Sequence, residues 1–208
     1  MNFTNDDVTK LLEIIKSRRD VRGNHFISKP IEDEKLSLIL EAGLSAPSVG
    51  YSQPWEFVVI KNKAIKQKVI KNFQKENEKA KEIFKDKELY KNLKLEGIEK
   101  TPINIAIIYN KPNKDILGMT SMQKMGEYSV VCAVQNMWLM ARALNIGIGW
   151  VSILDEKQLL KDINKNENST LIAYLCVGYV DEFLDEPELK TLGWEKKKKK
   201  EKIITFLK

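Results

Sequence analysis

Apolar residues recur along the chain at two spacings, one typical of helices and one typical of buried strands. In segments 4–19 and 31–45 the apolar positions are three or four residues apart, which predicts two amphipathic helices, the first capped by Thr4 or Asn5. Residues 124–145 are apolar around most of a helix, so we expect this long helix to be covered on several sides. Compact apolar runs rich in β-forming residues predict strands at 55–60, 102–109, 147–154 and 171–179.

The order of these elements predicts an α/β layered fold built around one sheet. A Lys/Glu-rich segment, 63–98, adds one or two partly exposed helices, a short helix precedes the last strand, and residues 110–123 form a loop. The long helix and the apolar residues near the C-terminus lack obvious cover within one small domain. We therefore expect a homodimer that buries them, the alternative being a monomer with a generous core.

The positive charge of the chain is concentrated at its C-terminal end. The 208 residues are 43% hydrophobic, which rules out a disordered chain, and they carry a net charge of +6. Residues 194–208 contain seven Lys and two Glu, or +5, so residues 1–193 carry only +1. No aromatic residues alternate with the lysine run 196–200, which indicates a solvated tail rather than a nucleic-acid site.

Arginine is rare in this chain, and it is clustered. Only four of the 35 basic residues are arginines, and three of them, Arg18, Arg19 and Arg22, fall within five residues. A guanidinium group grips phosphate with two parallel hydrogen bonds, so the cluster is the first candidate for an anion site. The alternative is a basic helix end that the helix dipole stabilises. Asp20 lies inside the cluster and repels phosphate, which indicates a separate task for its carboxylate or an ion pair with an arginine.

Two further segments have the composition of ligand-binding loops. In residues 46–55, APSVGYSQPW, two prolines and a glycine fix the backbone while Ser, Tyr and Gln offer hydrogen-bonding groups, which suits a planar ligand with polar edges. The alternative is a plain connection between a helix and a strand. Gly147 and Gly149 precede a strand and lack the third glycine of a dinucleotide-binding motif, so we expect them to allow a close approach of the backbone to a ligand ring.

Several classes of site and location are excluded by what the sequence lacks. His25 is the single histidine, so neither a zinc site nor a Ser-His-Asp triad is expected. Cys132 and Cys176 sit in apolar stretches without a C-x-x-C pair, and we expect buried reduced thiols in a cytoplasmic protein. The polar, acidic N-terminus predicts no signal peptide, and no apolar run is long enough to predict a membrane span.

Taken together, these segments resemble a known family. The segments RRDVR, APSVGYSQPWEF, LKLEGI, EYSVVCAVQNMWLMARA, GIGWVSIL and YLCVGYV occur in one order, followed by PEL and GW. This series is similar to the nitroreductase superfamily of FMN proteins, and within it to the 5,6-dimethylbenzimidazole synthases, the BluB family. The resemblance spans about residues 11–194. The chain departs from the family at Glu56, where a basic residue is more usual, in the lysines of the tail, and in the 110–126 loop, where Gly118 and Met122 still fit.

The resemblance implies a fold and an FMN site. It implies one α+β domain over residues 1–208, with a central mixed sheet flanked by helices, in a homodimer whose basic tail, 194–208, wraps the partner subunit. The arginines and Lys197 would hold the phosphate end of FMN, Lys94 would face the pyrimidine edge, and Val151 and Ser152 would lie against the isoalloxazine. The implied contacts are Arg18, Arg19, Asp20, Arg22, Lys94, Val151, Ser152 and Lys197 from one subunit and Pro47, Ser48 and Tyr51 from the other, with Ser129 near the interface.

The resemblance also implies a reaction. In the synthases, reduced FMN reacts with O2 and is cut into 5,6-dimethylbenzimidazole and erythrose 4-phosphate, with Asp20 in the position of the acid/base carboxylate and Ser152 in that of the polar group beside the ring. FMN is then a substrate. One alternative is an NAD(P)H-dependent reductase of nitroaromatics or quinones that recycles bound FMN. Another is a non-enzymatic module that binds nucleic acid or an acidic membrane through its basic tail. The synthase and the reductase would bind neither nucleic acid nor a membrane.

Overall fold

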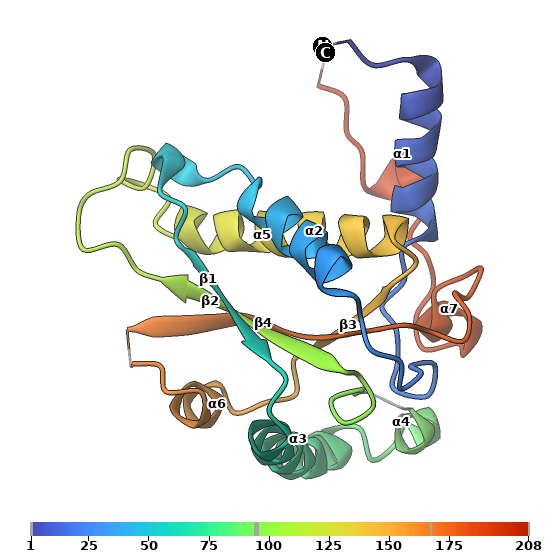
Figure 1. Cartoon of the computed structure of the whole chain (residues 1–208). Coiled ribbons are helices and arrows are strands. Elements are labelled where there is room, and N and C mark those ends of the chain that lie inside the picture. The colour runs from blue at the N-terminus through green and yellow to red at the C-terminus, as the bar shows by residue number, and fades with distance from the viewer. Residues whose placement is uncertain (1, 94–95, 167, 208) are drawn as a thin grey trace.

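A four-stranded sheet lies at the centre of the computed structural model, which describes residues 2–93, 96–166 and 168–207 (Figure 1). The strand order is β1 (Trp55–Ile60), β2 (Ile103–Asn110), β4 (Ser169–Gly178) and β3 (Gly147–Val151), and each neighbouring pair is antiparallel. The sequence resemblance implies a mixed sheet, with both parallel and antiparallel pairing. Within the described ranges, the parallel pairing is an isolated bridge between Asp20 and Ile148 at the β3 edge.

Helices cover both faces of this sheet. Figure 1 shows α2 and α5 on one face and α3 and α6 on the other. The helices are α1 (Asn5–Ser17), α2 (Asp33–Leu44), α3 (Lys63–Ile83), α4 (Glu88–Asn92), α5 (Met125–Ala143), α6 (Glu156–Asp162) and α7 (Glu188–Thr191), with 3-10 turns at Val49–Tyr51 and Lys200–Lys202. The predicted helices and strands are all present, although several end at different residues.

The two central strands are apolar along most of their length because both of their faces are buried. In β2, Ile103, Ile105 and Ile107 pack into the cluster that includes residues of α2 and α5. The intervening Ala106 and Ile108 pack into a second cluster with residues of α3 and α6. A strand buried on both faces reads as a continuous apolar run instead of an alternating one, which is why the sequence predicts this strand so clearly.

The strand β3 is shorter than predicted. The prediction extends it to residue 154, whereas β3 ends at Val151. Beyond this point the backbone turns toward α3, since the main chain of Asp155 exchanges two hydrogen bonds with the side-chain amide of Asn72, at 2.7 and 2.8 Å. The Asp155 side chain then caps α6 by accepting from the Gln158 amide. Ser152 is therefore left exposed, just past the end of the strand.

The long helix α5 is buried along one side only by the described part of the chain. Its buried residues include Val134, Met137 and Ala141, whereas Tyr128 and Cys132 are exposed. One chain therefore does not provide the predicted cover on several sides. The expectation of a buried thiol is wrong for Cys132, because its position on α5 faces away from the core, and it is confirmed for Cys176. Among the described residues, no helix combines the length and apolarity needed to cross a membrane.

The two ends of the chain carry apolar side chains that the described residues leave exposed. Thr4 caps α1, as predicted, by accepting from the Asp7 amide, but the described part of the chain buries no residue of α1. Figure 1 shows α1 and the last residues of the chain projecting away from the sheet. The exposed apolar set comprises Val8, Leu11, Leu12 and Ile15 on α1 and Ile203, Ile204, Phe206 and Leu207 near the C-terminus.

Candidate functional site

The arginine cluster lies along the open edge of β3. Besides the bridge of Asp20, the Val21 amide donates to the Ile148 carbonyl at 3.0 Å. This pairing needs glycine at position 149, because a Cβ there would lie 2.4 Å from the Val21 carbonyl oxygen. A Cβ on Gly147 would likewise meet a methyl group of residue 180 at 2.5 Å. The glycines of β3 therefore admit the chain's own segments and not a ligand ring, which corrects the sequence-based expectation.

The Asp20 carboxylate is fixed on this edge by two partners. Its Oδ1 accepts a hydrogen bond from the Trp150 amide at 2.9 Å, and its Oδ2 lies 3.3 Å from Nη2 of Arg22. Burial raises the pKa of Asp20 above its ordinary value, while Arg22, the Trp150 amide and Arg18 pull the pKa down to a smaller extent. The side chain is still 34% exposed, so the carboxylate is held in place and remains open to a ligand.

Arg19 and Arg22 have their guanidinium groups engaged within the chain. Among the described residues, the Arg19 side chain donates only to main-chain carbonyls, those of Lys16, Arg18, Leu184 and Asp185. The Nε and Nη1 bonds are 2.7–2.8 Å long, and Nη2 makes a further bond to Asp185. Arg19 thereby fastens the 184–185 segment to the end of α1. Arg22 lies between two carboxylates, Asp20 and Glu188, the latter at 3.6 Å.

Arg18 differs from both. Its guanidinium carbon lies 4.6 Å from the centre of the Trp138 ring, and its side chain makes no hydrogen bond or ion pair within residues 2–93, 96–166 and 168–207. Burial lowers the pKa of Arg18, and the carboxylate of Asp20 acts in the opposite direction. Within the described part of the chain, Arg18 is thus the member of the cluster whose N–H donors are open to an anion.

The 46–54 loop is held to the N-terminal part of α5. Ser129, which is only 5% exposed, accepts from the Val49 amide at 3.0 Å and donates to the Met125 carbonyl at 2.7 Å. Tyr51 has a φ angle of 52°, a left-handed conformation that costs a non-glycine residue about 1–2 kcal/mol. The Tyr51 side chain is 83% exposed, and Pro47 is exposed as well. The loop therefore presents predicted ring contacts outward from a fixed backbone.

The loop and the arginine cluster contact α5 at different places. The cluster meets α5 at Trp138, and the loop meets it at Ser129, nine residues earlier. At 1.5 Å per residue these positions are about 14 Å apart along the helix. Within one chain, the loop and the arginine cluster therefore contact different turns of α5.

The two predicted residues at the end of β3 lie close to the cluster and differ in exposure. Segment 151–152 directly follows the part of β3 that the cluster borders. Val151 is buried, and its side chain packs into the hydrophobic core between the sheet and helices α3 and α6. A ligand at this position would therefore meet its main chain. Ser152 is exposed, and its hydroxyl is accessible to a ligand.

The remaining predicted residues lie in the tail or outside the described residues. Lys94 falls outside the described residues. Lys197 is exposed. The pKa of Glu186 is lowered chiefly by its hydrogen bond from Lys190, with Lys197 among the smaller contributions. The first residue of the tail packs against the rest of the chain, since the centre of the Trp194 ring lies 5.5 Å from that of Phe84.

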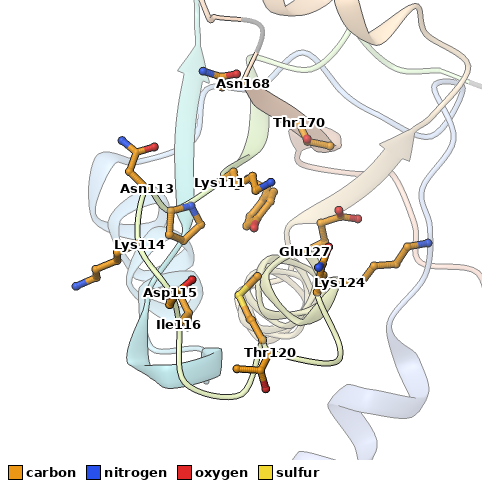
Figure 2. Close-up of a pocket in the computed structure, with 14 residues that line it drawn as sticks. Lys111, Asn113, Lys114, Asp115, Ile116, Thr120, Lys124, Glu127, Asn168 and Thr170 are labelled. Atoms are coloured by element: carbon orange, nitrogen blue, oxygen red, sulfur yellow. The ribbon is translucent and has the colours of Figure 1, made fainter.

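A separate cleft lies beneath the loop that follows β2 (Figure 2). It has a volume of about 830 Å³, and none of the described site candidates lines it. Figure 2 shows that side chains of both charges surround it, since Lys111, Lys114 and Lys124 share the lining with Asp115 and Glu127. The two carboxylates offset most of the lysine charge, and the lining contains no arginine to grip a phosphate with two parallel hydrogen bonds.

One residue of the site carries no signal in the sequence. Trp138 lies in the apolar run of α5, where an aromatic side chain predicts only a core position. It is 8% exposed, its indole Nε1 donates to the Arg19 carbonyl at 3.0 Å, and its ring lies against Arg18. Only the fold reveals that this core residue also contacts the arginine cluster.

The raised pKa of Asp20 predicts a pH-dependent change in stability. A carboxyl group that holds its proton more tightly in the folded state loses stabilising effect as the pH rises from 3.8, its ordinary pKa, through its folded pKa. We therefore expect Asp20→Asn to gain stability relative to the native protein over this pH range. Urea unfolding at about pH 3.5 and about pH 7 measures the difference, with Asp33→Asn on the exposed surface of α2 as the control. A difference that does not change with pH would contradict the expectation.

Comparison with known proteins identifies the family. The sequence matches the family described as "Nitroreductase family" over residues 15–179. The chain belongs to the nitroreductase family. This nitroreductase-family enzyme is 36% identical over 185 residues to the 5,6-dimethylbenzimidazole synthase of Rhodospirillum rubrum, a match that covers 87% of each chain. It is 34% identical over 200 residues to the synthase of the same name from Rhodobacter capsulatus, covering 94% of this chain and 95% of that one.

Solved structures share the fold of this nitroreductase-family enzyme. An oxidised iodotyrosine deiodinase bound to FMN and 3-iodo-L-tyrosine matches 95% of this chain and 99% of its own, with a TM-score of 0.70 and 20% identity. A putative nitroreductase from Desulfovibrio desulfuricans in complex with FMN matches 95% of this chain and 96% of its own, with a TM-score of 0.68 and 20% identity. The α+β nitroreductase-like fold implied by the sequence is thus confirmed.

Proposed function

We propose that this chain is a 5,6-dimethylbenzimidazole synthase that consumes reduced FMN and O2. Two synthases of that name are 34–36% identical to it over most of their length. The observation that carries the proposal is the Asp20 carboxylate, which lies among three arginines yet stays partly exposed beside the end of β3. A carboxylate there repels a phosphate, so its partial exposure supports a role for Asp20 beyond its pairing with Arg22.

The arginine cluster fits the phosphate of FMN. Arg18 is half-buried with its N–H donors unengaged by the described residues, and an anion would offset the cost of burying its charge. In this proposal Arg18 holds the phosphate and Lys197 approaches it from the tail, while Arg22, which lies between Asp20 and Glu188, keeps the Asp20 carboxylate in place beside it. Arg19 contributes by shaping the segment, because its guanidinium donates to main-chain carbonyls.

The flavin ring would lie beyond the end of β3, beside Asp20, Val151 and Ser152. When bound, reduced FMN supplies the electrons for O2 and the ring system from which the benzimidazole is made. Asp20 would accept or return a proton at the ring, since the Trp150 amide fixes the position of its Oδ1. The exposed Ser152 hydroxyl would donate a hydrogen bond to an oxygen at the ring, and Lys94 would face the pyrimidine edge.

A second copy of the chain would complete this site. The 46–54 loop, held by Ser129, and the arginine cluster contact α5 about 14 Å apart, and in this proposal Pro47, Ser48 and Tyr51 contact the flavin of the partner. The apolar side of α1 and residues 203–207 are exposed in one chain, which supports a dimer in which they are covered. In this proposal residues 1–208 form one cytoplasmic FMN-binding domain, and the 194–208 tail wraps the partner.

The departure at Glu56 lies away from the arginine cluster. Glu56 lies on β1, at the opposite edge of the sheet from β3 and the arginine cluster. Its carboxylate accepts hydrogen bonds from Lys165 and, at 3.0 Å, from Asn110. The hydrogen bond from Lys165, followed by that from Asn110, lowers the pKa of Glu56. Glu56 therefore has a local partner of opposite charge and does not contact the arginine cluster.

Aerobic incubation with reduced FMN tests the proposal. The protein is mixed with FMN, a separate flavin reductase and NADH in air, and 5,6-dimethylbenzimidazole is measured by liquid chromatography with mass detection. We expect the product with the protein and none when the protein is omitted. Oxidation of NAD(P)H by the flavin-loaded protein and a quinone, with FMN recovered intact and no benzimidazole, would instead establish the alternative reductase function.

A further inference from the structure

We infer that Trp138 is a positioning residue that makes this site selective for a phosphorylated flavin over an uncharged one. The inference rests on the proposed function, because it concerns the arginine that would hold the FMN phosphate. Trp138 lies on α5 and is 8% exposed, so its ring is not available to stack on the flavin. It acts through two groups of the arginine cluster, the side chain of Arg18 and the main chain of Arg19.

The indole ring orients the Arg18 side chain without using its hydrogen-bond donors. The guanidinium carbon lies 4.6 Å from the ring centre, a distance at which the ring quadrupole attracts the cation. The N–H donors of a guanidinium lie in its own plane, so a contact with an aromatic face leaves them free. An arginine held in this way keeps its planar fork available for the oxygens of a phosphate.

The same indole fixes the backbone that carries Arg18. Its Nε1 donates to the Arg19 carbonyl at 3.0 Å, directly after Arg18 in the chain. The ring also packs 6.2 Å from that of Trp150, whose amide holds Asp20. The two tryptophans therefore hold the arginine segment from one side, while the pairing of the next residue, Val21, with β3 holds it to the sheet.

Without the indole, the carboxylate of the same segment is an available partner for Arg18. The attraction between Arg18 and Asp20 opposes the effect of burial on the pKa of each group, although for Asp20 it is weaker than the effects of Arg22 and the Trp150 amide. If Arg18 turned toward Asp20, its donors would be occupied and a phosphate would lose a ligand. The indole thus keeps Asp20 paired with Arg22 and keeps Arg18 open.

Flavin titration of tryptophan variants tests this role. The dissociation constants of oxidised FMN and riboflavin are measured by flavin fluorescence for the native protein, Trp138→Phe, Trp138→Leu and Arg18→Ala. We expect Trp138→Leu to reduce the preference for FMN over riboflavin by about tenfold, through weaker FMN binding. Trp138→Phe keeps an aromatic face, although a smaller one, and loses the Nε1 hydrogen bond, so we expect a smaller reduction of about twofold. Phe57→Leu, which replaces an aromatic residue of β1 packed on the same core cluster, is the control and should leave the preference unchanged.

Two comparisons separate positioning from a general loss of structure. If Trp138 acts through Arg18, adding Trp138→Leu to Arg18→Ala changes the FMN preference no further. Equal weakening of FMN and riboflavin by Trp138→Leu, or an unchanged preference in a folded Trp138 variant, would overturn the inference. If Trp138→Leu does not fold, Trp138→Phe decides the question. The titration measures only the binding of oxidised flavins. Its result therefore holds whether the enzyme consumes FMN or recycles it.

Discussion

Replacing Asp20 with Asn is expected to lower the rate of benzimidazole formation by at least about 100-fold, the lower end of what a positioned acid or base contributes. Asparagine has nearly the same shape, and its side-chain oxygen can still accept from the Trp150 amide, but it cannot take up a proton. The rate is measured from the initial formation of 5,6-dimethylbenzimidazole at saturating reduced FMN in air. Asp33→Asn, at an exposed carboxylate of α2, makes the same change in charge and is expected to leave the rate unchanged.

The binding of FMN distinguishes a lost proton transfer from a damaged site. Asp20 is an anion beside the proposed phosphate ligands, so its neutralisation should leave the dissociation constant of FMN unchanged or make it smaller. A slow variant that binds FMN at least as tightly as the native protein would therefore place the defect in the reaction. Retention of more than about a third of the native rate would contradict the acid/base role of Asp20.

Substitution on the apolar side of α1 is expected to have the second largest effect. Leu11 and Ile15 are 54% and 44% exposed in one chain. The double variant Leu11→Glu/Ile15→Glu is expected to shift the protein from dimer to monomer in sedimentation velocity at micromolar concentration. Since the loop that carries Ser48 and Tyr51 would come from the partner, FMN affinity should fall together with dimerisation by about 100-fold, as the loss of two or three hydrogen bonds would give.

Lys10→Gln is the matched control for this experiment. Lys10 lies on the opposite side of α1 from the apolar residues, and the substitution changes the charge in the same direction without adding a carboxylate to the apolar side. It should remain dimeric and retain FMN. A double variant that stays dimeric would refute the placement of α1 in the interface, and a monomer that binds FMN with native affinity would refute the shared site.

The sequence predicts the elements of this fold well where burial is uniform along a segment. The central strands are continuous apolar runs, predicted at 102–109 and 171–179 and observed at Ile103–Asn110 and Ser169–Gly178. The prediction for the strand at 147 is too long because its apolar pattern continues to Leu154, whereas the hydrogen bonds between Asp155 and Asn72 draw the backbone away from the sheet. A contact between residues 83 positions apart leaves no trace in a local pattern.

The candidate site, like the fold, is predictable from the sequence only in part. The clustering of arginines around Asp20 and the motif at 147–152 could both be identified from the sequence, and the structure brings these segments together at one sheet edge. The different partners of the arginines could not be foreseen, because the carbonyls that accept from Arg19 include two that are 165 and 166 positions away. The contact of Trp138 with Arg18 is hidden for a related reason, since a buried tryptophan gives the same pattern whatever it touches.

The fate of FMN in a single exposure to air tests the central claim most directly. The protein is loaded with a limiting, known amount of FMN, the flavin is reduced without oxygen, and air is then admitted with excess reductant. Remaining FMN and 5,6-dimethylbenzimidazole are measured in the same sample. A synthase loses one FMN for each benzimidazole that appears. Full recovery of FMN while the reductant is consumed would contradict the proposal and leave a flavin-recycling reductase.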